Sequence, residues 1–142
     1  MQNYANHTRL DLGYHRILLP VLFLTFVGSC VNLGKSWGDH ERIYNASLIF
    51  VLTACTLVLA VYARVFALKA QDRAIRAEEN FRHHILTGKL LDPRLSVGQI
   101  VALRFASDDE LPSLAARAAV ENLPPKEIKL AVKDWRADEY RV

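Results

Sequence analysis

The chain has 142 residues, of which 51% are hydrophobic, and its 18 Lys and Arg against 15 Asp and Glu give a formal net charge of +3. The length suffices for one soluble domain, but the apolar residues are gathered into two blocks and are not spread as a globular core requires. The weakly basic balance comes without a nucleic-acid-binding motif, so we expect no nucleic-acid partner.

The first apolar block follows a charged N-terminal arm, residues 1–16. It contains 18 uncharged residues before Lys35, and roughly 20 apolar residues cross a bilayer core as a helix. We therefore predict a transmembrane helix over about 17–34. A cleaved signal peptide is the alternative, because the block lies close to the N-terminus. The length of the arm and the polar Asn32 favour a retained span.

A small and polar face marks this first predicted helix. Such residues let membrane helices approach closely and form hydrogen bonds with one another. The face consists of Thr25, Gly28, Ser29 and Asn32.

The second apolar block, residues 43–63, has 21 consecutive uncharged residues and predicts a second span. No stop signal follows it, because helix-forming sequence continues to Gly88, the first credible C-cap. We therefore predict one long helix that ends at Thr87, with residues 64–88 as its cytoplasmic extension.

Lysine and arginine are unevenly placed around the two spans. Two lie in the N-terminal arm, two in the loop between the spans and seven within residues 64–94. Positive residues are retained on the cytoplasmic side of a membrane. Residues 17–63 are therefore expected to form a transmembrane helical hairpin, with both termini in the cytoplasm.

A row of small residues, which we call the seam, follows the second predicted helix. Its spacing alternates between three and four residues, and this period lets helix backbones approach closely and supercoil left-handedly. The helix propensity of alanine explains the number of alanines but not their register. The seam consists of Thr53, Thr56, Ala60, Ala63, Ala67, Ala70, Ala74, Ala77 and Phe81.

The seam continues unchanged from apolar into charged sequence, which predicts a protein partner that follows the helix out of the membrane. The first span can cover the half within the membrane. The remaining half requires the C-terminal helices, a second copy of the chain or another protein.

Residues 89–142 predict a cytoplasmic tail of about three short helices. Ser96 with Gln99 and Ser107 with Glu110 have the spacing of capping boxes, and a Pro-Pro pair at 124–125 predicts the start of a third helix. Trp135 is expected on one face of that helix. The predicted tail core is Leu103, Leu111, Leu114, Ile128, Val132 and Trp135.

The sequence carries no recognisable catalytic chemistry. A nucleophile elbow, a phosphate-binding loop and a paired zinc motif are all missing, so we expect no enzyme activity, cofactor or metal. All five histidines lie outside the spans, which disfavours a haem held within the bilayer. Glu79 and His83 are four residues apart, but two ligands do not make a metal site. Uncharged spans also disfavour active transport.

The stretches QDRAIRAEENFRHHILTGKLLDPRLSVGQIVALRFASDDELPSLAARA and IKLAVKDWRADEYRV, with LRFASDDELP as the most distinctive string, resemble an uncharacterised family of small bacterial membrane proteins with two predicted spans. The similarity covers nearly the whole chain. The resemblance implies a location in the bacterial inner membrane and brings no activity or catalytic residue with it.

The sequence as a whole predicts an all-α membrane protein without catalytic activity. We expect a structural or assembly subunit of a larger membrane complex or of a homo-oligomer. Its partners would be membrane lipids and either other membrane-protein subunits or copies of itself. The alternatives are a homo-oligomeric membrane pore and an accessory subunit of a membrane enzyme or bioenergetic complex.

Overall fold

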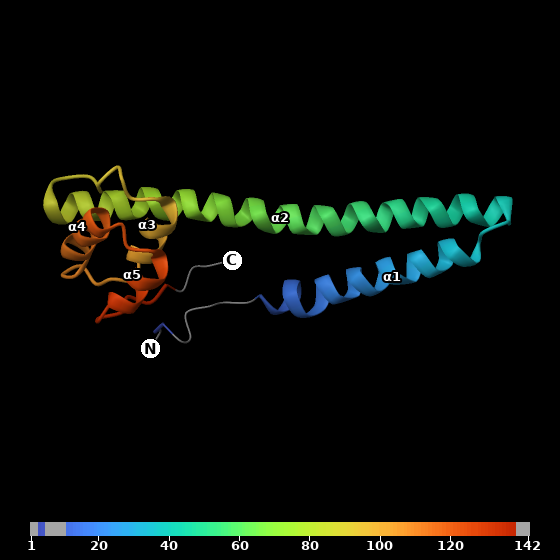
Figure 1. Ribbon diagram of the computed structural model, residues 1–142, viewed down its shortest axis with the longest axis horizontal. Coiled ribbons are helices and arrows are strands. Elements are labelled where there is room, and N and C mark those ends of the chain that lie inside the picture. The colour runs from blue at the N-terminus through green and yellow to red at the C-terminus, as the bar shows by residue number, and fades with distance from the viewer. Residues whose placement is uncertain (1–2, 5–10, 139–142) are drawn as a thin grey trace. The chain divides into compact units, whose positions relative to one another are not determined.

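The computed structural model describes residues 3–4 and 11–138. These residues form a π-helix and five α-helices and contain no β-strand, which confirms the predicted all-α fold (Figure 1). Half of the predicted N-terminal arm and the last four residues of the predicted tail lie outside the described residues. The helices are η1 (Gly13–Leu18), α1 (Leu19–Lys35), α2 (His40–Thr87), α3 (Val97–Leu103), α4 (Leu111–Glu121) and α5 (Pro125–Ala131).

The chain divides into two compact units. One comprises Leu10–Ala67 and is called the apolar unit below, and the other comprises Met1–Arg9 with Leu68–Val142 and is called the tail unit. Helix α2 passes from the first unit into the second without interruption. It contains neither glycine nor proline, so no residue within it breaks the helical hydrogen-bond pattern.

Two helical segments in the described residues are long and apolar enough to cross a membrane. They are Gly13–Lys35, with 23 residues, and His40–Thr87, with 48 residues. In the most apolar stretch of each, only 6% of the residues are buried. The core helix of a soluble protein would be mostly buried, so packing within this chain does not account for their apolar character.

A tight turn joins α1 to α2. Gly38 has a φ of 95°, a left-handed conformation that glycine adopts without a steric penalty. The next residue, Asp39, accepts a hydrogen bond from the amide of Arg42 at 3.1 Å and caps the first turn of α2.

The other end of α2 lies where the sequence predicts it. The helix ends at Thr87, and Gly88 follows with a φ of 73°. The Gly88 amide donates to the carbonyl of His84 at 2.7 Å, so a left-handed glycine closes the helix.

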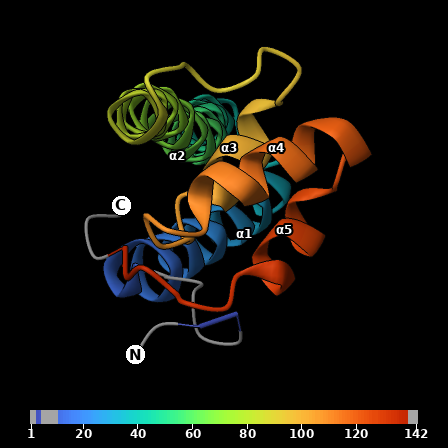
Figure 2. The same ribbon diagram turned by 90° about the vertical axis from the view of Figure 1, so that its left-hand side faces the viewer.

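Helices α3, α4 and α5 gather into one small cluster in the tail unit (Figure 2). The capping box of α3 is confirmed, because the Ser96 hydroxyl accepts from the Gln99 amide and the Gln99 side chain accepts from the Ser96 amide. Five of the residues predicted for the tail core are buried: Leu103, Leu111, Leu114, Ile128 and Val132.

The second predicted capping box does not form. Helix α4 begins at Leu111, and no side chain caps it. A cap at Ser107 would have placed Pro112 in the fifth helical position, where its ring clashes with the preceding turn and its missing amide leaves a hydrogen bond unmade. With the observed start, Pro112 lies in the first turn, where it is tolerated.

The predicted third helix is shorter than expected. Helix α5 ends at Ala131, and Val132 is already extended. Trp135 therefore does not lie on a helix face as predicted. It forms an isolated bridge with Ala106, next to the hydrogen bond from the Arg136 amide to the Phe105 carbonyl at 2.8 Å. These partners satisfy the backbone without a helix.

Candidate interaction surface on α2

Helix α2 presents two different faces within the tail unit. Ile75 and Glu79 are 8% and 5% exposed, and the Arg82 side chain is 12% exposed. These three residues recur at helical spacing and define what we call the back face, which the tail covers. A lone helix cannot bury its own side chains to this extent, so this face is already occupied by the chain itself.

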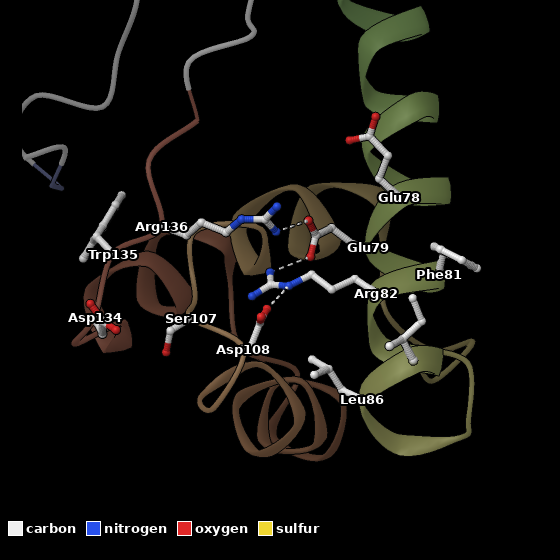
Figure 3. A pocket seen from close by; sticks show the side chains of 11 residues that line it. Glu78, Glu79, Phe81, Arg82, Leu86, Ser107, Asp108, Asp134, Trp135 and Arg136 are labelled. Atoms are coloured by element: carbon white, nitrogen blue, oxygen red, sulfur yellow. Dashed lines mark hydrogen bonds and ion pairs between the residues drawn. The ribbon is translucent and has the colours of Figure 1, made fainter.

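Arg82 is the central side chain of the back face (Figure 3). Its guanidinium contacts Asp108 Oδ1 at 2.6 Å and Glu79 Oε2 at 3.0 Å, and it donates to the Ala106 carbonyl at 2.8 Å. Glu79 also lies 3.8 Å from Arg136. The buried Glu79 carboxylate is therefore matched by two cations, as a buried charge requires.

Phe105 anchors the segment that follows α3. It is fully buried, its ring lies 4.9 Å from that of the half-buried Trp135, and the Arg104 guanidinium lies 4.5 Å from its ring centre. Arg104 is itself buried and pairs with Asp138 at 2.8 Å. Sequence reasoning missed these roles of Phe105 and Arg82. The LRFASDDELP string, which holds Phe105, was the available signal for Phe105, whereas Arg82 had no local signal.

The seam lies on a different face of α2. Within the tail unit its members Ala70, Ala74, Ala77 and Phe81 are all exposed, with Phe81 65% exposed. Covering of this half by the chain's own C-terminal helices was one of three predicted possibilities. In the described residues, the tail contacts the back face through Ala106, Asp108 and Arg136, which lie in the segments after α3 and α5. In the apolar unit Ala63 is exposed, and the remaining seam residues are half-buried: Thr53, Thr56, Ala60 and Ala67.

One residue of the predicted packing face on α1 reaches the seam. Ser29, which is 4% exposed, hydrogen-bonds to the Thr53 hydroxyl at 3.0 Å. Thr25 instead donates to the Val21 carbonyl of its own helix, and Gly28 and Asn32 are exposed. Of the four residues predicted for this face, Ser29 therefore makes the polar contact to α2 in the described residues.

Tyr14 provides a second polar contact that the sequence did not predict. Its hydroxyl donates to the Ala60 carbonyl at 2.6 Å, and the Arg64 guanidinium lies 5.9 Å from its ring centre. A tyrosine beside an arginine at the end of an apolar stretch is typical of the edge of a membrane.

A groove of about 710 Å³ lies along one side of α2 in the tail unit (Figure 3). Four carboxylates and two guanidinium groups line it, a formal excess of two negative charges. The charged groups are Glu78, Glu79, Asp108, Asp134, Arg82 and Arg136, and the apolar walls include Phe81, Ile85, Leu86 and Trp135.

Glu79 and His83, considered above as possible metal ligands, each have other partners. Glu79 pairs with the two arginines, and His83 Nδ1 lies 2.8 Å from the Lys89 carbonyl. Over residues 3–4 and 11–138, no three His, Cys, Asp or Glu side chains are grouped to hold a metal ion.

Comparisons with curated proteins and with solved structures find no match to this chain. One family model matches residues 1–142, the whole chain, and its description is a family of unknown function, DUF6526. That match agrees with the uncharacterised family expected from the LRFASDDELP region. The chain belongs to this family of unknown function, DUF6526.

Proposed function

We propose that this chain is a non-catalytic integral membrane protein that acts as an interaction subunit, either in its own oligomer or in a larger membrane complex. In this proposal the apolar unit forms a transmembrane hairpin in the bacterial inner membrane. The tail unit lies in the cytoplasm, where it holds α2 in place for a partner.

The exposure of apolar side chains supports insertion into a membrane. Leu24 and Leu59 are each 67% exposed, and large apolar residues are costly in water at about 25 cal/mol per Å². The apolar stretch over 43–63 measures roughly 30 Å at 1.5 Å per residue, which equals the thickness of a bilayer core. Lipid around both helices would remove this surface from water.

The positions of aromatic residues support the proposed location of the two membrane surfaces. Trp37 and Tyr44 are 80% and 66% exposed next to the turn between the helices. Tyr14 contacts Ala60 at the opposite end of the apolar unit. Tyr44 and Ala60 lie roughly 24 Å apart along α2 at 1.5 Å per residue. Aromatic groups near both ends of an apolar stretch fit the interfacial belts of membrane proteins.

The distribution of charge supports a cytoplasmic tail. Seven lysines and arginines lie within residues 64–94, beyond the end of the second apolar block. By the positive-inside rule this end of the hairpin faces the cytoplasm. The proposed turn near Trp37 then faces the opposite side of the membrane.

The exposed tail half of the seam carries the proposal of an interaction subunit. In the described residues, the tail contacts the back face of α2, whereas Ala70, Ala74, Ala77 and Phe81 are exposed. Small residues in this register let a second helix approach closely. A protein partner on this face explains why the spacing of small residues continues from the proposed membrane segment of α2 into its proposed cytoplasmic segment.

Extraction of the full-length protein in mild detergent, followed by native mass spectrometry, tests this function. An interaction subunit should appear above the monomer mass, alone or with another protein. The same pure protein should give no ion flux in liposomes. Ion flux from pure protein would favour the pore instead, and a lone monomer would contradict the proposal.

A further inference from the structure

We infer that the partner on the tail half of the seam is a second copy of this chain, with its α2 parallel to the first and in the same register. This inference rests on the proposed function, because insertion of both copies into one membrane in the same orientation makes the two helices parallel. It adds the identity of the partner and the contacts that select it.

The spacing of the seam defines a coiled-coil register. Residues at heptad positions a and d of such a helix face the partner, and positions e and g flank them on either side. Positions a are Ala67, Ala74 and Phe81, and positions d are Ala70 and Ala77.

Two charged residues then take up complementary flanking positions. Arg73 follows Ala70 by three residues and occupies a g position, and Glu78 follows Ala77 directly and occupies an e position. In a parallel pair a g residue faces the e residue five positions later on the other helix. Arg73 and Glu78 are five positions apart, and both are exposed, so two Arg73–Glu78 pairs would form, one on each side.

The charges on the two sides of the seam are also opposite in sign, with acidic groups on the e side and cations on the g side. On the e side Glu78 lines the groove that carries a formal excess of two negative charges. On the g side α2 presents the exposed cations Lys69 and Arg73. A two-fold axis along the helices places the cationic side of each copy against the acidic side of the other, as a self-complementary interface requires.

An antiparallel pair would lose this match. In that arrangement g residues face g residues and e residues face e residues, so cationic sides would meet each other. Like charges in contact destabilise a helix pair by about as much as opposite charges stabilise it.

A second copy would also cover the large apolar side chain at the end of the seam. Phe81 is 65% exposed in the tail unit, where the surrounding sequence is charged. In a parallel pair in register, the two Phe81 rings meet at the same a position. In the described residues, Phe81 forms part of the groove wall beside the tail, but this contact leaves its side chain largely exposed.

Disulfide cross-linking of the full-length protein in membranes tests the geometry. The background variant is Cys30→Ala with Cys55→Ala, which removes both native thiols. Ala77→Cys should cross-link two copies at the same residue, as a d position of a parallel pair does. Arg76→Cys lies off the seam and should cross-link far less. Equal cross-linking of both variants, or none at Ala77→Cys, would overturn the inference.

Charge reversal tests the pairing. Arg73→Glu and Glu78→Arg each place like charges together twice per pair of copies, and each should lower the cross-linked fraction at Ala77→Cys on the order of tenfold. The double variant Arg73→Glu with Glu78→Arg restores opposite charges and should recover most of the wild-type fraction. Additive loss in the double variant would exclude the predicted pairing.

The same experiments separate this inference from the proposed function. If Ala77→Cys does not cross-link but Ala74→Leu releases a different protein from the extracted complex, the second copy is excluded and the interaction subunit stands. If the wild-type protein is a lone monomer that nothing accompanies, both fail.

Discussion

Arg82 and Asp108 form a hydrogen-bonded ion pair of 2.6 Å between α2 and the segment that follows α3, and the two side chains differ greatly in exposure. The Arg82 side chain is 12% exposed, whereas that of Asp108 is 68% exposed. The buried partner of Arg82 is instead Glu79, with a side chain 7% exposed. The energetic importance of this cluster therefore lies in the pairing of Arg82 with Glu79.

Replacing Arg82 with alanine should destabilise the tail unit by about 3 kcal/mol, because it leaves the buried Glu79 carboxylate with only the longer contact to Arg136. Chemical unfolding of the full-length protein in detergent measures the change. The matched control is Arg117→Ala, which removes a pair with Glu121 in which both side chains are about half exposed. That change should cost less than about 1 kcal/mol. Equal costs would contradict the assigned role of Arg82.

Phe105 should contribute more to stability than Trp135, although tryptophan is the larger residue. Phe105 is fully buried, while Trp135 is only partly buried beside it. Phe105→Ala should cost roughly 4 kcal/mol, within the range for buried aromatic residues, and Trp135→Ala should cost less. Unfolding curves of the two variants give the order. A larger cost for Trp135→Ala would show that the extended segment, and not Phe105, anchors the tail.

The carboxyl group of Asp92, in the turn before α3, should titrate at unusually low pH. Hydrogen bonds from the Arg94 side chain and backbone amide lower the pKa of Asp92 from 3.8 to about 2. Because the folded pKa is lowered, the pair stabilises the turn fully above about pH 4, and this contribution is lost as the pH falls toward 2.

Carboxyl NMR of the full-length protein should give a midpoint for Asp92 near pH 2, and Arg94→Gln should raise it toward the ordinary value. Since Arg94 is exposed and Asp92 is only half-buried, the change in overall stability should be small. A wild-type midpoint near 3.8 would show that the hydrogen bonds between Asp92 and Arg94 do not persist in solution.

Thiol labelling on intact cells should reveal the orientation of the proposed hairpin. With Cys30 and Cys55 replaced by alanine, Trp37→Cys should react with a reagent that does not cross membranes, and Lys126→Cys should react only after the cells are opened. Trp37 is preferable to Gly38, whose φ of 95° a cysteine adopts poorly. The opposite labelling pattern would reverse the assigned orientation.

Local signals in the sequence predicted much of the fold. The absence of glycine and proline between 40 and 87, followed by Gly88, determines the length and end of α2. Ser96 with Gln99 predicted the start of α3, because a capping box is a contact between near neighbours. A capping box predicted at Ser107 does not form, because Pro112, five residues later, is tolerated only in the first turn of α4 and so determines where this helix begins.

Contacts between distant residues could not be read from the sequence. Arg82 meets Asp108, Tyr14 meets Ala60, and Glu110 accepts the amides of residues 133–134. Each contact depends on tertiary packing that periodicity does not encode. The periodicity of the seam predicted one face of α2, but which face the tail covers depends on Arg82, whose burial had no local signal.

The association state of seam variants tests the central claim most directly. Ala74→Leu adds bulk where two backbones would approach and should weaken association by roughly 1 to 3 kcal/mol, while Arg76→Leu adds an apolar side chain off the seam. Arg76 is a better control than Gln71, which is half-buried.

Native mass spectrometry of the extracted full-length proteins should find the wild type and Arg76→Leu in the same assembly and Ala74→Leu shifted toward the monomer, with insertion into the membrane unchanged. If Ala74→Leu keeps the wild-type assembly and partners, the alanines are only good helix formers, and the proposal of an interaction subunit is wrong.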